Sequence, residues 1–370
     1  MKTSSFCAFF LSAFFTTATQ GRIQINSCRS SRGGTCIDVW KCPYYVNLLN
    51  SKPRPPTLIP KMKQNLCGFV NRETPKVCCR QLDRGVVSGG DFITSHENFH
   101  LLPVDSCGPI SHSTRITEGG RTSPREFPWM ALIAYKTGDS AEDGDFKCGG
   151  SLINERYVLT AAHCLDETSV LGIRLGEYDI QTEKDCDPRG QNCEPPVQDI
   201  LIDKIIIHNG YNPSTYSHDI GLIRLATPAN LNLDNVKPIC LPYGTLLNVN
   251  LVGKFLTVTG WGVTETGHKS MVLNKASIPI VPLKECKKLY GKFKPISKGQ
   301  ICAGGYKGRD SCSGDSGGPL QYITSVGNTQ RYVQDGIVSY GPSQCGIDGR
   351  PAIYTDIKEY MSWILDNIEP

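Results

Sequence analysis

The sequence lacks the features that mark a membrane protein, an N-glycoprotein or a nucleic-acid-binding protein. Beyond the N-terminus, no stretch approaches the 18 apolar residues of a membrane span, so no membrane partner is expected. No Asn-x-Ser/Thr acceptor with a non-proline middle residue occurs, so N-glycosylation is not predicted. The net charge of +4 is too small to favour nucleic acid as a partner.

The chain does have a secretory leader and many cysteines. Lys2 precedes an apolar run at 6–15 and the small-residue stretch TTATQG, which together predict a signal peptide over 1–20 and a secreted, extracellular protein. Only Cys7 of the seventeen cysteines lies in this leader, and the others suffice for a full set of disulfides in an oxidising compartment. A length of 370 residues with 39% hydrophobic residues favours two globular units.

The first predicted unit is the cysteine-dense segment 28–79. Its pattern C-x7-C-x5-C-x24-C-x10-C-C suggests that disulfides supply much of its stability, because so short a segment buries little core. Metal binding is the alternative, although the segment has no C-x2-C pair and no histidine. Within it, SKPRPPTLIPK predicts an extended, exposed loop. Residues 80–115 are typical of a linker, in which Cys107 stands alone.

The second predicted unit, 116–370, is rich in short β-type runs separated by turn formers, which indicates an all-β barrel or sandwich domain. These runs are MALIAY, YVLTAA, ILIDKIIIH, DIGLIRL, FLTVTGWG, QDGIVSY and AIYTDI. The closing stretch IKEYMSWILDNI has apolar residues at i, i+3 and i+4 spacing, which predicts a C-terminal helix with one buried face.

Three motifs supply the parts of a nucleophilic site. DSCSGDSGGPL places Ser316 on a glycine-rich turn, where the N–H groups of Gly314 and Ser316 would stabilise an oxyanion by roughly 3 kcal/mol per donor. A serine needs a positioned base, and LTAAHC supplies His163. HDIGLIRL supplies Asp219, which is costly to bury unless it bonds a group such as a histidine Nδ1–H. Each motif taken alone is more often structural.

Together, in the order His163, Asp219, Ser316, these motifs resemble those of the chymotrypsin-like serine proteases. The resemblance covers essentially all of 116–370 and includes EFPWMALI, CGGSLI, TGWG and GRPAIYT. It implies a mostly β fold of two orthogonal six-stranded barrels, with the active site in the cleft between them.

The same resemblance implies a substrate pocket. It places Asp310 at the pocket base, which implies cleavage after Arg or Lys, as in trypsin. Ser339 and Gly341 correspond to the strand that pairs with the substrate backbone. Ala352 departs from the pocket-wall glycine usual in trypsins, and its methyl group would narrow the slot without removing the charge. The resemblance implies no required cofactor. Glu177 stands where some relatives hold calcium, so a structural calcium ion is the one metal suggested.

The stretch SHSTRITEGG aligns with the activation junction of the family's zymogens. The resemblance implies that a cut between Arg115 and Ile116 frees an amine, which pairs with Asp315 and orders the oxyanion hole and pocket. Glu118 departs from the family's common I-V-G-G sequence, in which a glycine occupies its position.

The segment 28–79 resembles the clip domain of arthropod haemolymph proteases, which include prophenoloxidase-activating and Easter-type enzymes. This resemblance rests on the terminal Cys-Cys pair and on the position ahead of a linker and a trypsin-like domain. It implies a regulatory docking module. The two resemblances imply the disulfides Cys28–Cys78, Cys36–Cys67, Cys42–Cys79, Cys148–Cys164, Cys286–Cys302 and Cys312–Cys345. Cys186 and Cys193 bracket a short inserted loop and are expected to pair with each other, which leaves Cys107–Cys240 as the remaining pair.

The resemblances imply a secreted zymogen of the haemolymph, cut after Arg115 by an upstream trypsin-like protease. Its expected partners are a protein substrate (prophenoloxidase or a cytokine-like Toll-ligand precursor), serpin inhibitors and non-catalytic protease homologues. The alternative is that this chain is itself such a homologue and acts as a cofactor or scaffold. The intact His163, Asp219 and Ser316 argue against that alternative.

Overall fold

The computed structural model describes residues 28, 35–50, 58–70, 74–79, 93–111, 119–136, 144–166, 170–186, 190, 193–264, 267–290, 295–306, 310–312, 314–342 and 346–370. The chain divides into two units, residues 1–92 and 93–370. The predicted signal peptide and the residues Arg115, Ile116 and Glu118 lie outside the described residues.

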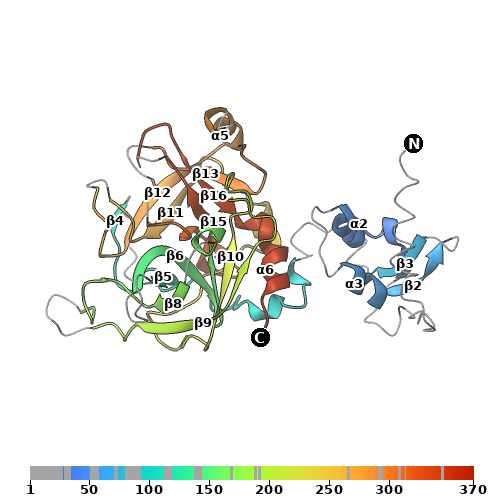
Figure 1. The fold of residues 1–370 in the computed structure, drawn as a ribbon, viewed down its shortest axis with the longest axis horizontal. Helices are drawn as coiled ribbons and strands as arrows, with labels where there is room; N and C mark the ends of the chain where they lie inside the picture. Colours follow the sequence, from blue (N-terminus) through green and yellow to red (C-terminus); the bar gives the residue numbers. More distant parts are fainter. Residues whose placement is uncertain are drawn as a thin grey trace. The chain divides into compact units, whose positions relative to one another are not determined.

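The first unit is a small antiparallel sheet in the order β1-β3-β2, accompanied by short helices (Figure 1). Its strands are β1 (Thr35–Asp38), β2 (Leu66–Val70) and β3 (Thr74–Cys79). Its helices are η1 (Val39–Lys41), α2 (Pro43–Asn50) and α3 (Leu58–Gln64). Buried residues from both helices, the 3-10 turn and β3 form one apolar core.

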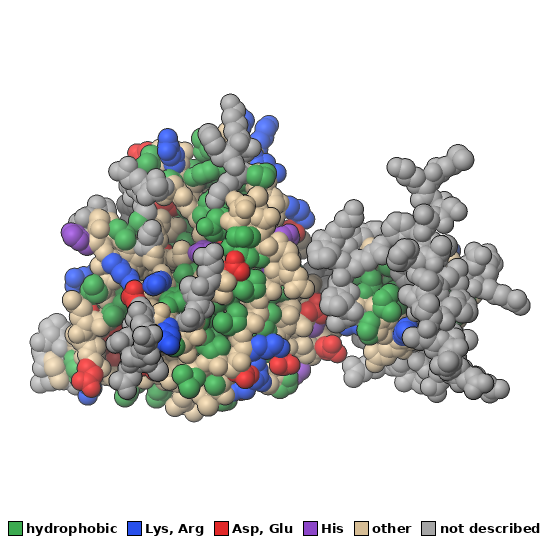
Figure 2. Space-filling model, in the orientation of Figure 1, with side chains coloured by type: hydrophobic (Ala, Val, Ile, Leu, Met, Phe, Trp, Pro, Cys, Tyr) green, Lys and Arg blue, Asp and Glu red, His purple; other side chains and the backbone are tan. Residues whose placement is uncertain are grey.

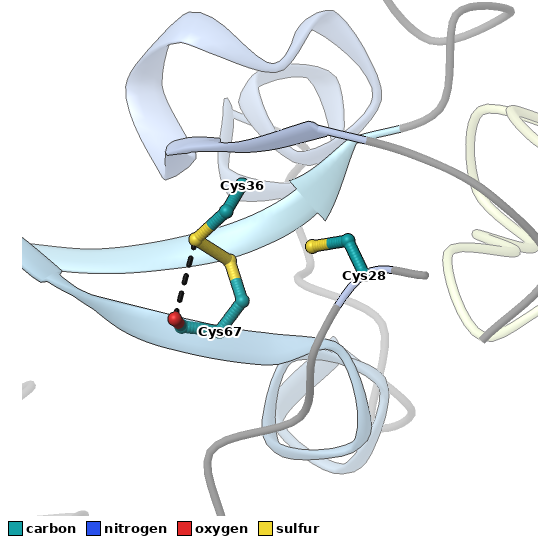
Figure 3. A group of neighbouring side chains, drawn as sticks. All are labelled: Cys28, Cys36 and Cys67. Carbon is teal, nitrogen blue, oxygen red and sulfur yellow. Dashed lines mark hydrogen bonds between the residues drawn. A yellow bond between two sulfur atoms is a disulfide. The ribbon is translucent and has the colours of Figure 1, made fainter. Parts of the chain in front are cut away.

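Disulfides join Cys28–Cys78, Cys36–Cys67 and Cys42–Cys79, the pairs that the clip-domain resemblance implies. Figure 3 shows Cys28 beside the Cys36–Cys67 bridge, in which Cys36 Sγ lies 3.2 Å from the Cys67 carbonyl oxygen. The three sulfur atoms lie within 4.8 Å of one another, close enough to suggest a metal site. Because the disulfides use all three sulfurs, the thiolates that a metal would need are not available.

The extended loop predicted for SKPRPPTLIPK is wrong at its C-terminal end, where α3 begins at Leu58. Leu58 and Met62 are only 2% and 1% exposed. Being four residues apart, they lie on one helix face and pack into the core. Pro60 is tolerated because it lies in the first helical turn, where no intrahelical N–H donor is needed.

The second unit contains two antiparallel barrels, which confirms the predicted mostly β, double six-stranded architecture (Figure 1). The first closes in the order β10-β7-β6-β5-β8-β9. Its strands are β5 (Met130–Lys136), β6 (Gly144–Asn154), β7 (Tyr157–Thr160), β8 (Val170–Leu175), β9 (Gln198–Ile207) and β10 (Gly221–Leu225).

The second barrel has the order β11-β14-β15-β16-β13-β12 and closes through the pairing of β11 with β12, with β4 added beside β12. Its strands are β4 (Gly119–Arg121), β11 (Phe255–Gly260), β12 (Asn274–Val281), β13 (Gln300–Ala303), β14 (Pro319–Val326), β15 (Thr329–Tyr340) and β16 (Ala352–Asp356). The helix α5 (Leu283–Tyr290) lies between β12 and β13 in the sequence, and the 3-10 segment η5 (Gly244–Asn248) precedes β11.

The C-terminal helical stretch is confirmed as η6 (Ile357–Tyr360) followed by α6 (Met361–Asn367). All six apolar residues that define its predicted buried face are at most 5% exposed: Ile357, Tyr360, Met361, Ile364, Leu365 and Ile368.

The predicted linker 80–115 is shorter in the structure, because Ile93 and the residues after it fold with the second unit. This docked segment, residues 93–111, includes η3 (Phe99–Leu101) and lies beside α6 in Figure 1. Asn98 Nδ2 donates to two carbonyl oxygens at the end of α6, at 2.9 and 2.8 Å. The Arg331 guanidinium donates to the Cys107 carbonyl at 2.7 Å, and Cys107 forms a disulfide with Cys240.

No helix in the described part of the chain is long and apolar enough to cross a bilayer. On the face of the second unit drawn in Figure 2, basic and acidic side chains are interspersed among apolar ones.

Candidate active site

His163 lies on the 3-10 segment η4 (Ala162–Cys164), directly after β7. Its neighbour Cys164 is fixed twice, by a disulfide to Cys148 on β6 and by a hydrogen bond from Tyr135 OH to its carbonyl oxygen (3.0 Å). The backbone of His163 is therefore held by two strands of the first barrel, and its ring is half-buried.

Asp219, fully buried just before β10, orients the His163 ring. One carboxylate oxygen lies 2.8 Å from His163 Nδ1, and the other accepts the His163 backbone N–H at 2.9 Å. Ser339 Oγ, on β15 of the second barrel, also donates to this carboxylate. An ionised carboxylate can only accept, so Nδ1 carries the proton and Nε2 keeps the lone pair of a general base.

Ser316 lies on a turn that is bonded to both barrels. Its carbonyl oxygen accepts the Gly149 N–H from β6 (2.8 Å), and the next amide, Gly317 N–H, donates to Val338 O on β15 (2.9 Å). Gly317 has φ +79°, and a Cβ there would lie 2.1 Å from Thr160 Oγ1, so no larger residue fits. Among the described contacts, no hydrogen bond joins Ser316 Oγ to His163. Such bonds often tighten only when substrate binds.

The two predicted oxyanion donors remain free within the described backbone network. The Asp315 N–H, which lies between them in the sequence, donates to Cys312 O at 3.0 Å, whereas Gly314 and Ser316 donate to no described backbone oxygen. The resemblance gives these amides the role of binding a ligand oxygen.

The Asp315 carboxylate is held by two backbone amides. It accepts hydrogen bonds from Gly262 N–H and Cys312 N–H, both at 2.9 Å. Burial raises its pKa to about 6 despite these bonds. A cation placed beside it would favour the charged form, which is the role that the resemblance gives to the Ile116 amine.

Asp310 has one satisfied carboxylate oxygen and one that is not. Its Oδ1 accepts the Ser311 N–H at 2.9 Å, while Oδ2 is buried and has no hydrogen-bond partner among the described residues. Burial raises the pKa of this carboxyl to about 7, against the effect of the hydrogen bond from the Ser311 backbone. An unpaired, buried carboxylate oxygen is the complement of a guanidinium or ammonium group.

Of the other predicted pocket residues, Ser339 lies on β15, Gly341 follows the end of that strand, and Ala352 begins β16. Ser339 and Ala352 are 3% and 1% exposed. The Ala352 methyl carbon lies 3.2 Å from where a side chain at Gly341 would begin. The extra methyl of Ala352 therefore faces Gly341, which has no side chain.

Tyr216, which the sequence motifs do not signal, also belongs to the site. Its ring centroid lies 5.6 Å from that of His163 and 5.1 Å from that of Tyr340. Tyr216 adopts φ +53°, which is uncommon for a bulky residue. It lies in an irregular loop without periodicity, so only the folded chain shows this contact.

Glu177 lies beside a second carboxylate, Asp185. Glu177 Oε1 and Asp185 Oδ2 both accept the Tyr178 N–H, at 2.9 and 3.2 Å. Burial and, more weakly, the Asp185 charge raise the pKa of Glu177, although Arg174 donates to its other oxygen at 3.3 Å. Two converging carboxylates suit a divalent cation, and calcium takes such hard oxygen ligands.

The remaining disulfides of the second unit join Cys186–Cys193 and Cys286–Cys302. Cys312 is also disulfide-bonded, and its expected partner Cys345 lies outside the described residues.

Comparisons with known proteins match both units. The trypsin family model matches residues 116–364, and the model of the regulatory CLIP domain of proteinases matches residues 26–79. Phenoloxidase-activating factor 3 of Holotrichia diomphalia is 40% identical over 96% of each chain. The Spaetzle-processing enzyme of Drosophila melanogaster is 36% identical over 97% of this chain and 96% of its own. The crystal structure of the Drosophila Grass clip serine protease of the Toll pathway superposes with a TM-score of 0.65 at 34% identity, covering 90% of this chain and 94% of its own.

Proposed function

This chain belongs to the trypsin family of serine proteases and carries a regulatory CLIP domain. We therefore propose that it is a secreted zymogen whose activated form cuts proteins after Arg or Lys. The observation that carries the proposal is the bond between His163 Nδ1 and the buried Asp219 carboxylate. It leaves Nε2 as the base for Ser316, whose turn is bonded to both barrels.

The Arg/Lys specificity rests on Asp310. Its buried, unpaired Oδ2 costs free energy in the empty pocket, and a substrate cation would remove that cost. Binding energy from this contact would favour basic residues at the cleavage point over aromatic or aliphatic ones.

We propose a protein substrate of the kind named by the relatives: prophenoloxidase, by analogy with phenoloxidase-activating factor 3, or a Toll-ligand precursor, by analogy with the Spaetzle-processing enzyme. An upstream protease that cuts after Arg115, serpin inhibitors and protease-homologue cofactors complete the proposed set of partners. In the non-catalytic alternative the chain would bind such proteins without cutting them. The hydrogen-bonded His163–Asp219 pair and the presence of Ser316 favour the enzyme.

The test of the proposal is controlled activation. Cleavage of the purified zymogen after Arg115 should release activity toward Arg and Lys peptides, and Arg115→Gln should block that release. Because Cys107 is bonded to Cys240, the two chains should run as one band without reductant and as two with it. N-terminal sequencing of the heavy chain should begin at Ile116.

The matched controls are two double substitutions. Cys107→Ser with Cys240→Ser should give two bands without reductant, whereas Cys186→Ser with Cys193→Ser removes a disulfide within the heavy chain and should still give one. An Arg115→Gln zymogen that activates normally would contradict the proposed junction.

We also propose that Glu177 and Asp185 contribute to a structural calcium site. At a calcium concentration of about 100 times Kd, binding would stabilise the folded state by about 2.7 kcal/mol and raise Tm by roughly 5 °C or more. Thermal unfolding with calcium and with a chelator measures this shift. It should vanish in Glu177→Gln.

The control for that experiment is Asp145→Asn, which changes a half-exposed carboxylate that pairs with Lys269 at 3.9 Å. This variant should keep the calcium response. An unchanged response in Glu177→Gln would remove Glu177 from the site.

A further inference from the structure

The residue before Asp219, His218, belongs to a cluster of four aromatic residues that the proposed mechanism does not use. We call His208, His218, Tyr360 and Trp363 the aromatic clamp. The His208 and His218 rings are stacked, with centroids 4.7 Å apart and planes 4° from parallel. The Tyr360 ring meets both edge-on, and Trp363 packs against His208 with centroids 5.3 Å apart.

The clamp joins the C-terminal helical stretch to the residue directly before Asp219. Tyr360 OH, at the end of η6, is hydrogen-bonded to His218 Nδ1 at 3.1 Å. Tyr360 is 5% exposed, so this bond is shielded from solvent. Asp219 itself is tied to the second barrel, because Thr355 Oγ1 on β16 donates to its carbonyl oxygen at 2.6 Å.

The backbone at His218 needs such support. His218 adopts φ +55°, a left-handed conformation that costs free energy for a non-glycine residue. Ile220 N–H donates back to His218 O at 2.9 Å, which closes a three-residue turn centred on Asp219. Any rotation of His218 out of its strained conformation would therefore move the Asp219 carboxylate.

Burial favours the neutral form of both histidines of the clamp. Burial, with a smaller effect from His218, lowers the pKa of His208 to about 4, and burial also lowers that of His218. Burial, together with nearby Asp356, Glu359 and Asp219, raises the pKa of Tyr360, which keeps its hydroxyl protonated. Neutral rings can stack without charge repulsion, and a neutral imidazole can share one hydrogen bond with the tyrosine.

We propose that the aromatic clamp, through the Tyr360–His218 bond, is a positioning device for Asp219. It holds the strained turn so that the carboxylate meets His163 Nδ1, and it touches neither substrate nor the reacting atoms. This inference rests on the proposed protease function. It adds His218 and Tyr360 to the residues on which turnover depends.

The test uses full-length activated protein and a small Arg peptide. Tyr360→Phe keeps the ring and loses the hydroxyl, so it should lower kcat about fivefold to tenfold and leave KM within about twofold. His218→Ala should lower kcat about 100-fold, because misplacement of a catalytic group by about 1 Å has that effect. His218→Asn should recover most of the loss, since asparagine tolerates the left-handed region and offers an acceptor to Tyr360.

Two controls separate positioning from general loss of stability. Tyr157→Phe removes a tyrosine hydroxyl that accepts the Glu369 N–H from the same C-terminal segment (3.1 Å), and it should leave kcat unchanged. In an Asp219→Asn background, Tyr360→Phe should cause no further loss of kcat, because the carboxylate it positions is gone. An undiminished effect in that background would overturn the proposal, as would a Tyr360→Phe enzyme with normal kcat.

A spectroscopic readout keeps this inference apart from the protease assignment. In the uncleaved chain, proton NMR should show the His163 Nδ1–H shared with Asp219 as a downfield resonance protected from exchange. That resonance should broaden in Tyr360→Phe and His218→Ala but not in Tyr157→Phe. If activated wild-type protein cuts no substrate, the proposed protease function is wrong. If the resonance stays sharp in both Tyr360→Phe and His218→Ala, only the proposed positioning role of the aromatic clamp is wrong.

Discussion

Ser316→Ala should lower kcat/KM of the activated enzyme by roughly four to six orders of magnitude. The loss is large because the substitution removes the attacking oxygen from a turn that hydrogen bonds to Gly149 and Val338 fix between the barrels. The substitution removes only an oxygen, so the fold and Tm should be preserved. Hydrolysis of a chromogenic Arg peptide, with active-site titration of the wild type, measures the effect.

A double substitution checks that Ser316 and His163 act as a unit. His163→Ala alone should cost nearly as much as Ser316→Ala, and the pair together should cost little more than either. Additive losses would mean that the two residues serve separate steps. Full hydrolysis by Ser316→Ala would refute the serine-protease proposal.

Asp310→Ser should abolish the preference for Arg and Lys at the cleavage point. The substrate cation would then be buried without a counter-charge, a situation that costs several kcal/mol, so kcat/KM for basic substrates should fall by roughly three orders of magnitude. Profiling a peptide library with variant and wild type gives the result. Asp315→Ser is not a suitable control, because it disturbs the oxyanion turn. Asp145→Asn, outside the pocket, should retain wild-type selectivity.

The same carboxyl predicts a pH dependence of ligand binding. Burial raises the Asp310 pKa to about 7, and a cation bound beside this carboxyl must lower it, because the ionised form pairs with the cation. Below about pH 7 the Asp310 carboxyl of the ligand-free protein is increasingly protonated. Binding of a cationic ligand then releases a proton, so the affinity for the ligand falls as the pH falls. Benzamidine titrations between pH 5 and 9 should show this slope in the wild type. The slope should disappear in Asp310→Ser.

The sequence predicted secondary structure best where apolar residues recur at a regular spacing. The buried face of η6 and α6 follows from six apolar residues at helical spacing, and all six are buried. The β-type runs coincide with strands such as β5 and β10, because alternating or continuous apolar runs bounded by turn formers have few other stable arrangements.

Features that depend on a partner elsewhere in the chain were not predictable. The proline content, including Pro60, predicts an extended segment. The free energy gained by packing Leu58 and Met62 into the core of the first unit nevertheless keeps α3 helical. The segment 93–111 has a linker-like composition, and it is ordered by hydrogen bonds to Arg331 and α6 from more than 200 residues away.

The residues of the candidate site also fall into a predictable and an unpredictable group. His163, Asp219 and Ser316 each carry a local motif, so a resemblance could name them. The contact of Tyr216 with the His163 ring and the bond from Tyr360 to His218 join segments with no shared motif. Such contacts follow from the packing of two barrels and a terminal helix, and no periodicity within one segment encodes them.

The short connection between the two units has a consequence for encounter kinetics. Between Cys79, at the end of β3, and Ile93, the first residue of the second unit, run only residues 80–92, which span at most about 45 Å when fully extended. The Cys107–Cys240 disulfide would keep the two units covalently connected after the proposed cleavage at Arg115. A protein held by the clip domain would thus be confined to a small volume around the protease, at a local concentration in the millimolar range. Cleavage of such a tethered substrate would become nearly intramolecular, so its rate would depend little on how dilute the substrate is in the surrounding fluid.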